Sequence, residues 1–467
     1  MDVSWRPTSV VAVANVNENG DSVRMADRKP DTTERAGPQL PAKLTDAPAQ
    51  RLIQPLARFL EIESASGVLL VICTVVALLL ANSHWAHDWE AFWHTEISLA
   101  IGNWKLEASL VHWINDGLMT IFFFVVGLEI KREMVDGELR SLRLAALPIL
   151  AALGGMVVPA GIYLLLQGSG AGRSGWGIPM ATDIAFAVGI LSLLGKRVPA
   201  GLKVFLLALA IADDIGAILV IALFYSKALH FGFLALAGAG LLVVLGMNRL
   251  GVRNMIAYFV VGLAIWLAMY QSGIHPTVAG VVLGLITPGQ AWLPRESLVN
   301  FVLDAIDRLD GRIDRPQVVD NLTKTARETL SPLERLQTLL HPWVAFAIMP
   351  VFALANAGVA VRPEAATAGV AWAVAAGLLL GKPLGIALFS YLAVKSGVTD
   401  LPSNVNWSAL IGAACLGGIG FTLSLFIAGL ALHGELLDAA KIGTLVGSTI
   451  SAVLGYVILR FATPSGP

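Results

Sequence analysis

Twelve apolar stretches recur along this chain, each close to the length of a helix that crosses a membrane. They lie at about 65–82, 108–128, 144–166, 177–194, 202–225, 231–247, 255–270, 274–289, 342–361, 368–394, 408–431 and 440–460. A helix needs about 20 predominantly apolar residues to span the hydrocarbon core of a bilayer. The pattern predicts an all-α membrane protein with about twelve transmembrane helices.

Basic residues gather in every second connection between these stretches, and the remaining connections carry one basic residue or none. The richer connections hold Lys131, Arg132, Arg140, Arg143, Lys196, Arg197, Lys203, Arg249 and Arg253, and seven more Lys and Arg follow within 290–341. Cytoplasmic loops carry the excess of Lys and Arg. We therefore predict that both termini are cytoplasmic.

The polar parts of the chain divide it into three regions. Residues 1–51 have no apolar core of a cleavable signal peptide and are predicted to be a disordered cytoplasmic tail. Residues 52–461 form the membrane domain, and 462–467 a short tail. The charged connection at about 290–341 repeats apolar residues at helical spacing between 298 and 309, which indicates a cytoplasmic surface helix. It is either a solvated connector or a regulatory surface.

The composition agrees with a bilayer as the solvent of this chain. Hydrophobic residues make up 56% and charged residues 14%, with a mean hydropathy of +0.72, whereas soluble domains carry about 25% charge. The net charge of -1 does not suggest a nucleic-acid partner. Cys73 and Cys415 have neither disulfide nor metal-ligand spacing. Since no Walker motif is present, we predict no cofactor and no use of ATP.

Two of the apolar stretches, the fourth and the eleventh, are interrupted by residues that loosen a helix. Within 177–194 lie Gly177, Pro179, Thr182 and Asp183, and within 408–431 lie Gly417, Gly418, Gly420, Thr422 and Ser424. Irregular backbone at membrane depth survives only where it is buried in protein or lines water. Segments three to five and ten to twelve then form two related units, an arrangement that indicates a binding site at the two breaks.

Asp213 and Asp214 are adjacent in the middle of the fifth stretch, flanked by about eleven apolar or small residues on either side. Each ionisable residue at such a depth costs roughly 2.5–3.5 kcal/mol on insertion scales. Two carboxylates this close are expected to titrate as a coupled unit. Their oxygens can hold protons or a hard cation such as Na⁺, but not both at full occupancy. The alternative is a structural polar pair buried between helices.

Three further polar residues at membrane depth complete the candidate site. Thr182 and Asp183 lie in the fourth stretch, where they either coordinate a cation or cap the second half-helix. Lys382 lies deep in the tenth stretch, and a lysine there requires a carboxylate partner. We expect an ion pair with Asp213 or Asp214. The alternatives for Lys382 are a purely structural role and proton carriage by the lysine itself.

Other ionisable residues lie nearer the ends of the stretches. Asp116 is either structural or part of an ion path, and Glu129 and Glu133 form either a cytoplasmic funnel for cations or an interfacial charge cluster. Histidine titrates in the physiological range, so His275 and His341 are candidates for pH sensing. Most histidines at such positions anchor or cap a helix instead.

The chain resembles the NhaA-type Na⁺/H⁺ antiporters of bacteria over about 52–460. The resemblance is carried by WINDGLMTIFFFVVGLEIKRE at 113–133, PMATDIAFAVGILSLLG at 179–195, LALAIADDIGAILVIALFY at 207–225, SGIHPTVAGVVLG at 272–284, HPWVAFAIMPVFALANAGV at 341–359, GKPLGIALF at 381–389 and LGGIGFTLSLFIAGLA at 416–431. It implies a secondary transporter of the inner membrane, not an enzyme, with inverted repeats and with the fourth and eleventh helices unwound and crossing near the midplane. It also implies electrogenic exchange of Na⁺ or Li⁺ for protons, and a homodimer.

The resemblance also implies roles for individual residues. Asp214 would be the principal cation ligand and proton carrier, and Asp213 its partner, alternately paired with Lys382. Thr182 and Asp183 would stand at the crossing of the unwound helices. Asp116 and Glu129 would match acids on the cytoplasmic side. Some pH-regulated members carry acidic and histidine residues just before the HPW motif, where this chain has Gln337 and Thr338. The resemblance therefore does not extend to pH regulation.

These residues predict alternating access around one buried carboxylate site that binds either Na⁺ or protons. A proton-coupled transporter of an organic solute would use the same acids but would need a larger polar cavity. An intramembrane aspartyl protease would need two aspartates that converge from different helices. A channel would not exchange ions stoichiometrically against a gradient.

Overall fold

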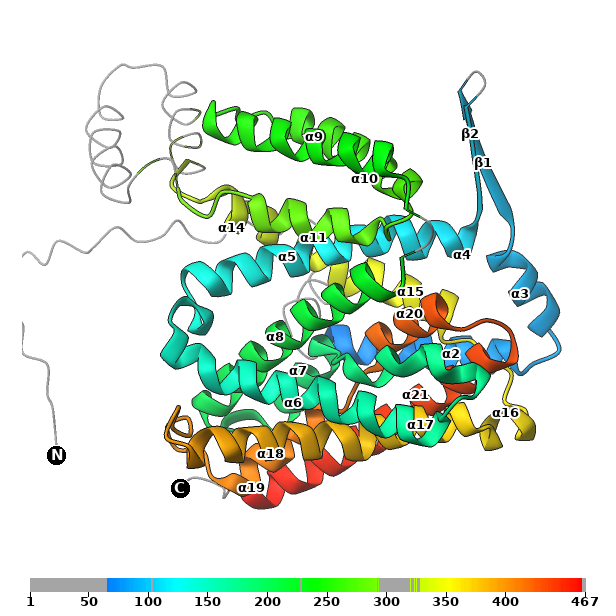
Figure 1. Ribbon diagram of the computed structural model, residues 1–467, viewed down its shortest axis with the longest axis vertical. Helices are drawn as coiled ribbons and strands as arrows, with labels where there is room; N and C mark the ends of the chain where they lie inside the picture. Colours follow the sequence, from blue (N-terminus) through cyan, green and yellow to red (C-terminus); the bar gives the residue numbers. More distant parts are fainter. Residues whose placement is uncertain are drawn as a thin grey trace, which may run out of the picture. The chain divides into compact units, whose positions relative to one another are not determined.

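The structure is a computed structural model that describes most of the predicted membrane domain (Figure 1). It describes residues 65–463 except 102–103, 227–228, 292, 294–319, 321–322, 324 and 326–327. The predicted N-terminal tail and the surface helix expected between 298 and 309 lie outside the described residues.

The first part of the described chain is helical apart from one β-hairpin. Its elements are α2 (Ala65–Ala81), α3 (Ala86–Trp93), β1 (Glu96–Ile101), β2 (Trp104–Ser109), α4 (Leu110–Trp113), η1 (Ile114–Leu118), α5 (Met119–Val135), η2 (Glu138–Arg140), α6 (Leu142–Gln167), η3 (Ala171–Met180), α7 (Ile184–Leu193), η4 (Gly195–Arg197) and α8 (Ala200–Phe224). The turn η1 is a π-helix, whereas η2, η3 and η4 are 3₁₀-helices.

The second part of the described chain is helical. Its elements are α9 (Phe231–Arg249), α10 (Met255–Ser272), α11 (Thr277–Ile286), α14 (Pro332–Trp343), η5 (Val344–Ile348), α15 (Met349–Asn356), α16 (Pro363–Thr367), α17 (Gly369–Ala376), η6 (Gly377–Gly381), α18 (Lys382–Lys395), α19 (Trp407–Gly417), α20 (Phe421–Ala431) and α21 (Glu435–Ala462). The turns η5 and η6 are π-helices that lie between the α-helices on either side of them.

The described residues contain many helices of membrane-spanning character. Eight are long and apolar enough to cross a membrane, and the number rises to as many as eleven if each of three bent helix pairs is one span. The remaining apolar helix, α11, is ten residues long. The prediction of a mostly helical protein with many membrane-spanning segments is confirmed.

The expectation of a purely α-helical chain is wrong at one place, the connection between α3 and α4. There β1 and β2 pair as an antiparallel hairpin in which Ile97 lies opposite Ala108, Leu99 opposite Leu106 and Ile101 opposite Trp104. The strands are only six residues long, and they lie in the connection between the first two predicted apolar stretches, where no membrane-spanning helix is predicted.

Glycines allow the helix that begins with Lys382 to lie very close to its neighbour. Gly154 of α6 and Gly385 of α18 face each other so closely that a Cβ atom on either would overlap the backbone of the other. Small residues let helix backbones approach in this way in membrane proteins. The position of α18, and hence of Lys382, depends on this contact.

Replacing Gly154 by Val is expected to lower the midpoint of thermal unfolding in detergent, because the added atoms have to push α18 away. Overpacking of this kind costs about 1–3 kcal/mol and occasionally more. Gly161→Val is the matched control, since it lies in the same helix and nothing approaches the place of its Cβ atom within 4 Å. Equal unfolding midpoints for the two variants would contradict the assigned contact.

Candidate functional site

Two bent helix pairs meet at the residues that interrupt the fourth and eleventh apolar stretches. The axes of η3 and α7 differ by 45°, and those of α19 and α20 by 42°. The backbone N–H of Asp183 donates to the carbonyl oxygen of Ile419 at 2.6 Å. Both breaks were predicted from glycine, proline and polar residues, and the structure brings them into direct contact.

The carboxylate of Asp183 joins the beginnings of two half-helices. Its Oδ1 accepts the backbone N–H of Phe186 at 3.1 Å and so caps α7. Its Oδ2 accepts the backbone N–H of Thr422 at 3.2 Å, at the start of α20, and also the hydroxyl of Thr422. A helix N-terminus carries partial positive charge. One buried carboxylate therefore compensates the N-terminal ends of both α7 and α20.

Lys382 pairs with Asp213, and Thr182 links them both to the second break. The ammonium of Lys382 donates to Oδ2 of Asp213 and to the hydroxyl oxygen of Thr182. The hydroxyl of Thr182 lies 2.7 Å from the same Oδ2 and 2.8 Å from the carbonyl oxygen of Gly417. Lys382 is 1% exposed and Asp213 is 2% exposed. The positive charge thus lies among oxygens from α8 and from both breaks.

Asp214 lies beside this ion pair on α8 and is equally buried, with 2% of its surface exposed. Within the described part of the chain, Oδ1 of Asp213 and Oδ1 of Asp214 are buried without a hydrogen-bond partner. Buried polar atoms are almost always satisfied, and a buried charge is costly unless it is compensated. The two oxygens are therefore suited to receive a proton or a small cation.

The donors do not form a site for a resident metal ion. Among the described residues, no group of three or more His, Cys, Asp or Glu side chains is arranged to hold one. The site instead combines two carboxylates with a hydroxyl and, through that hydroxyl, a backbone carbonyl. Oxygen ligands of this kind suit a hard cation.

Comparison with known proteins identifies the family to which this arrangement belongs. Residues 57–459 match the family model described as Na⁺/H⁺ antiporter 1. The chain belongs to this family. It is 51% identical to a Na⁺/H⁺ antiporter NhaA of Rhodopirellula baltica, over 89% of this chain and 96% of that protein. It is also 47% identical to a Na⁺/H⁺ antiporter NhaA of Rhizobium meliloti, over 90% of this chain and 98% of that protein.

Membership of the antiporter family confirms the resemblance that the sequence motifs carry. It identifies the protein as a membrane transporter of ions rather than an enzyme. The family supports Na⁺/H⁺ antiport as its activity. The protease alternative also does not fit the geometry, because Asp213 and Asp214 both project from α8 and Asp213 pairs with a lysine.

Glu129 and Glu133 of this antiporter lie near the end of α5 but differ in their contacts. Glu129 lies six residues before Val135, the last residue of α5. Oε1 of Glu133 accepts the backbone N–H of Glu138 at 2.7 Å and so holds the turn η2. Glu133 thus has a local structural contact, whereas Glu129 lies farther from the end of α5.

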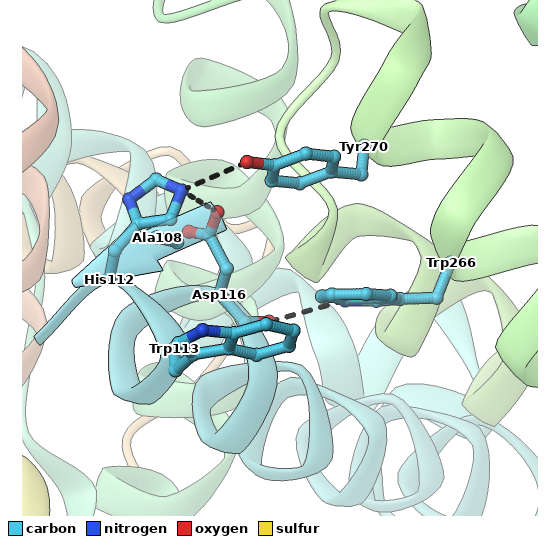
Figure 2. A pocket seen from close by; sticks show the side chains of 6 residues that line it. All are labelled: Ala108, His112, Trp113, Asp116, Trp266 and Tyr270. Atoms are coloured by element: carbon cyan, nitrogen blue, oxygen red, sulfur yellow. Dashed lines mark hydrogen bonds and ion pairs between the residues drawn. The ribbon is translucent and has the colours of Figure 1, made fainter. Parts of the chain in front are cut away.

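Asp116 lies in a separate cluster at the other end of the same helical run (Figure 2). Its Oδ2 is 2.9 Å from Nε2 of His112, and its Oδ1 is 3.3 Å from Nε2 of His275. Asp116 and Glu129 are thirteen residues apart, which corresponds to about 20 Å along a helix. The structure therefore does not bring Asp116 together with Glu129.

Aromatic side chains from α10 close this outer cluster. Trp266 Nε1 donates to the carbonyl oxygen of Asp116 at 3.2 Å, and the hydroxyl of Tyr270 is 3.4 Å from Nε2 of His112. The cavity between them is about 10 Å³, the lower limit for one water molecule. Figure 2 shows both rings turned toward the carboxylate-bearing helix. The cluster therefore joins α10 to α4 and η1.

The two histidines considered for pH sensing lie in different surroundings. His275 contacts Asp116 and, through Nδ1, the hydroxyl of Thr277 at 2.8 Å. His341 lies exposed in α14. Of these two histidines, His275 lies against the buried carboxylate of Asp116, as His112 also does.

Several residues of these two sites were not predicted as functional. The sequence marks Thr422 as part of an interrupted stretch, and in the structure it is the second residue of α20 and contacts Asp183. His112 precedes Asp116 by four residues, a spacing that places both on one helix face. Ser448, which accepts backbone N–H groups at the second break, has no local signal in the sequence.

Proposed function

We propose that this protein extrudes Na⁺, or Li⁺, in electrogenic exchange for protons and thereby serves sodium and pH homeostasis. The observation that carries the proposal is the buried group of Asp213, Asp214 and Lys382 at the meeting point of two broken helices. The family supports Na⁺ and H⁺ as the transported ions. The acids supply oxygens for which the two ions compete.

Competition at one site couples the two fluxes without a separate energy source. When the site faces the side of high proton concentration, protonation of the acids removes the ligands that hold Na⁺. When it faces the other side, loss of protons restores the carboxylates and Na⁺ binds again. Because both ions use the same oxygens, neither crosses without the exchange of the other.

The charges of the buried group explain why the exchange is electrogenic. Asp213 and Asp214 contribute two negative charges and Lys382 one positive charge, so the free site carries one net negative charge. One bound Na⁺ brings the site to zero, whereas two bound protons bring it to one positive charge. Each cycle then carries one net charge, and a membrane potential adds about 2.3 kcal/mol per charge per 100 mV.

The number of apolar segments supports a proposal for the membrane arrangement. The eight long helices, the three bent pairs and α11 add up to twelve segments, one for each predicted apolar stretch. We infer twelve spans in two inverted repeats, with the fourth and eleventh crossing at the breaks and with both termini in the cytoplasm of a bacterial cell. The resemblance to NhaA-type antiporters supports the bacterial inner membrane as the location and a homodimer as the assembly.

Site residues keep the roles that the resemblance assigns. Asp214 serves as the principal ligand and proton carrier, Asp213 as its partner in alternation with Lys382, and Thr182 and Asp183 as the polar groups of the crossing. Gly417, Gly418 and Gly420 permit the second break. Glu129 and Glu133 lie on the cytoplasmic part of the ion path. Asp116 takes part in the same path from the other end of the helical run that contains α5. His275 is the better placed of the two candidates for pH sensing, the other being His341.

Purified protein in liposomes with an imposed pH gradient tests the proposed exchange. Addition of Na⁺ or Li⁺ is expected to dissipate the gradient within seconds to minutes, whereas K⁺ at equal concentration has little effect. The Na⁺ concentration for half-maximal dissipation should rise as the pH falls, because protons occupy the same oxygens. Dissipation without added Na⁺ or Li⁺, or only when an organic solute is supplied, would exclude Na⁺/H⁺ exchange.

A further inference from the structure

The break between α19 and α20 is held in place by a serine that lies on a different helix, α21. Ser448 is buried, and its Oγ accepts the backbone N–H groups of Gly420 at 3.2 Å and of Phe421 at 3.1 Å. The first N–H groups of a helix have no partner within that helix, and an unsatisfied one in the protein interior is costly. Ser448 supplies the acceptor that lets α20 begin inside the protein.

The next N–H group along the chain is the one that reaches the candidate cation site. Thr422 donates its backbone N–H and its hydroxyl to Oδ2 of Asp183. Three consecutive backbone donors are therefore divided between two acceptors, with two bound to Ser448 and one to Asp183. Because Ser448 takes two of them, Asp183 keeps its other oxygen for Phe186 at the start of α7.

Thr182 connects this set of hydrogen bonds to Asp213. Thr182 directly precedes Asp183, and its hydroxyl lies 2.7 Å from Oδ2 of Asp213 and 2.8 Å from the carbonyl oxygen of Gly417. Without Ser448, the backbone N–H groups of Gly420 and Phe421 lose their acceptor, and Asp183, which already accepts from the next residue, Thr422, is a charged acceptor at the start of α20. A movement of Asp183 toward these donors would displace Thr182 and with it the hydroxyl that touches Asp213.

The same face of α21 also contacts the turn that leads to Lys382. Ser451, three residues after Ser448, donates its hydroxyl to the carbonyl oxygen of Leu378 at 3.5 Å. Leu378 belongs to the π-helical turn η6, which ends immediately before Lys382. One helix face therefore packs against both the break that contacts Asp183 and the turn that presents the lysine.

We infer that Ser448 is a positioning residue for cation binding. It holds the start of α20 so that Asp183 and Thr182 keep Asp213 in the geometry that binds the transported ion. The inference deepens the proposed Na⁺/H⁺ exchange and rests on it. Ser448, which bonds to Gly420 and Phe421 rather than to Asp213 or Asp214, would then influence the apparent affinity of the transporter for Na⁺.

Replacing Ser448 by Ala in the full-length protein tests this inference in liposomes with an imposed pH gradient. The Na⁺ concentration for half-maximal dissipation is expected to rise about tenfold, which corresponds to about 1.4 kcal/mol, while the maximal rate changes by less than about twofold. Ser448→Thr retains the hydroxyl and should restore most of the affinity. If Ser448→Ala does not accumulate, Ser448→Cys carries the test, because sulfur is a weak acceptor and should give a smaller rise in the same direction.

Two further hydroxyl deletions serve as matched controls for the loss of a serine or threonine. Ser390 of α18 is buried, and no described residue is a hydrogen-bond partner of its hydroxyl. Thr449 follows Ser448 on α21, is exposed, and bonds only within its own helix to Leu445 at 2.7 Å. Ser390→Ala and Thr449→Ala are expected to leave the half-maximal Na⁺ concentration unchanged.

The outcomes separate this inference from the proposed function. An active wild-type protein whose half-maximal Na⁺ concentration is the same as that of Ser448→Ala would overturn the positioning role alone. A lower maximal rate and a lower unfolding temperature at unchanged half-maximal Na⁺ would also overturn it, since that pattern indicates a purely structural role. Absence of Na⁺-driven dissipation in the wild-type protein would overturn both.

Discussion

Asp214→Asn is expected to abolish Na⁺-driven dissipation of a pH gradient, to the level of liposomes without protein. Asparagine has nearly the size of aspartate but neither carries a negative charge for Na⁺ nor takes up a proton at neutral pH. The folded protein should survive the change, because no described residue forms an ion pair with Asp214 and an uncharged amide is less costly to bury than a carboxylate. Dissipation measured with a pH-sensitive dye, together with thermal unfolding in detergent, checks both parts.

The same substitution at an exposed acid provides the control for this loss. Asp400 lies exposed in the connection after α18, and Asp400→Asn is expected to transport as the wild-type protein does. The unfolding midpoint of Asp214→Asn should equal or exceed that of the wild-type protein. Residual Na⁺-driven dissipation above background in Asp214→Asn would show that Asp214 is not the principal ligand. A large fall in its unfolding midpoint would show that its charge is structural.

The positions of the breaks were predictable because the signal is local. Glycine and proline weaken a helix wherever they occur, so Pro179 and the glycines at 417, 418 and 420 marked both places without knowledge of the fold. The depth of Asp213, Asp214 and Lys382 followed from the apolar residues around them. These predictions needed only the length of a span and the cost of burying a charge.

The choice of partner for Lys382 was not predictable from the sequence. Adjacent residues on a helix point about 100° apart, so the rotation of α8 about its axis decides whether Asp213 or Asp214 faces the lysine. That rotation is set by the packing of α8 against other helices, such as the close contact of Gly216 with the side chain of Met156 in α6. The role of Ser448 is of the same kind, because its acceptor function arises only where α21 crosses the break.

The hairpin and the outer cluster around Asp116 show two further limits. Strands of six residues carry a weak alternating signal, and these two lie in a connection between two predicted membrane-spanning stretches. His112 and Asp116 could be paired from their spacing of four residues, but His275 comes from another connection and meets them only through the fold. Contacts between distant segments are thus where the sequence was least informative.

Lys382→Ala is expected to destabilise the protein by about 3–5 kcal/mol, the usual effect of removing one partner from a buried ion pair. The substitution leaves the charge of Asp213 buried without its cation. The midpoint of thermal unfolding in detergent should fall clearly. Lys395→Ala is the control, because this lysine lies exposed at the end of the same helix. An unfolding midpoint equal to that of the control would mean that the buried pair does not stabilise the fold.

Removal of both charges distinguishes the structural from the transport role of the pair. The double variant Lys382→Met, Asp213→Asn removes both charges of the buried pair. Its unfolding midpoint should therefore recover most of the loss seen in Lys382→Ala. Asp214 alone then carries one negative charge, which either one Na⁺ or one proton neutralises. Exchange by the double variant should therefore be electroneutral: Na⁺ should still move protons, but a voltage-sensitive dye should report no transport-dependent potential, in contrast to the wild-type protein. A potential of wild-type size would mean that the net charge carried per cycle does not come from Lys382 and Asp213.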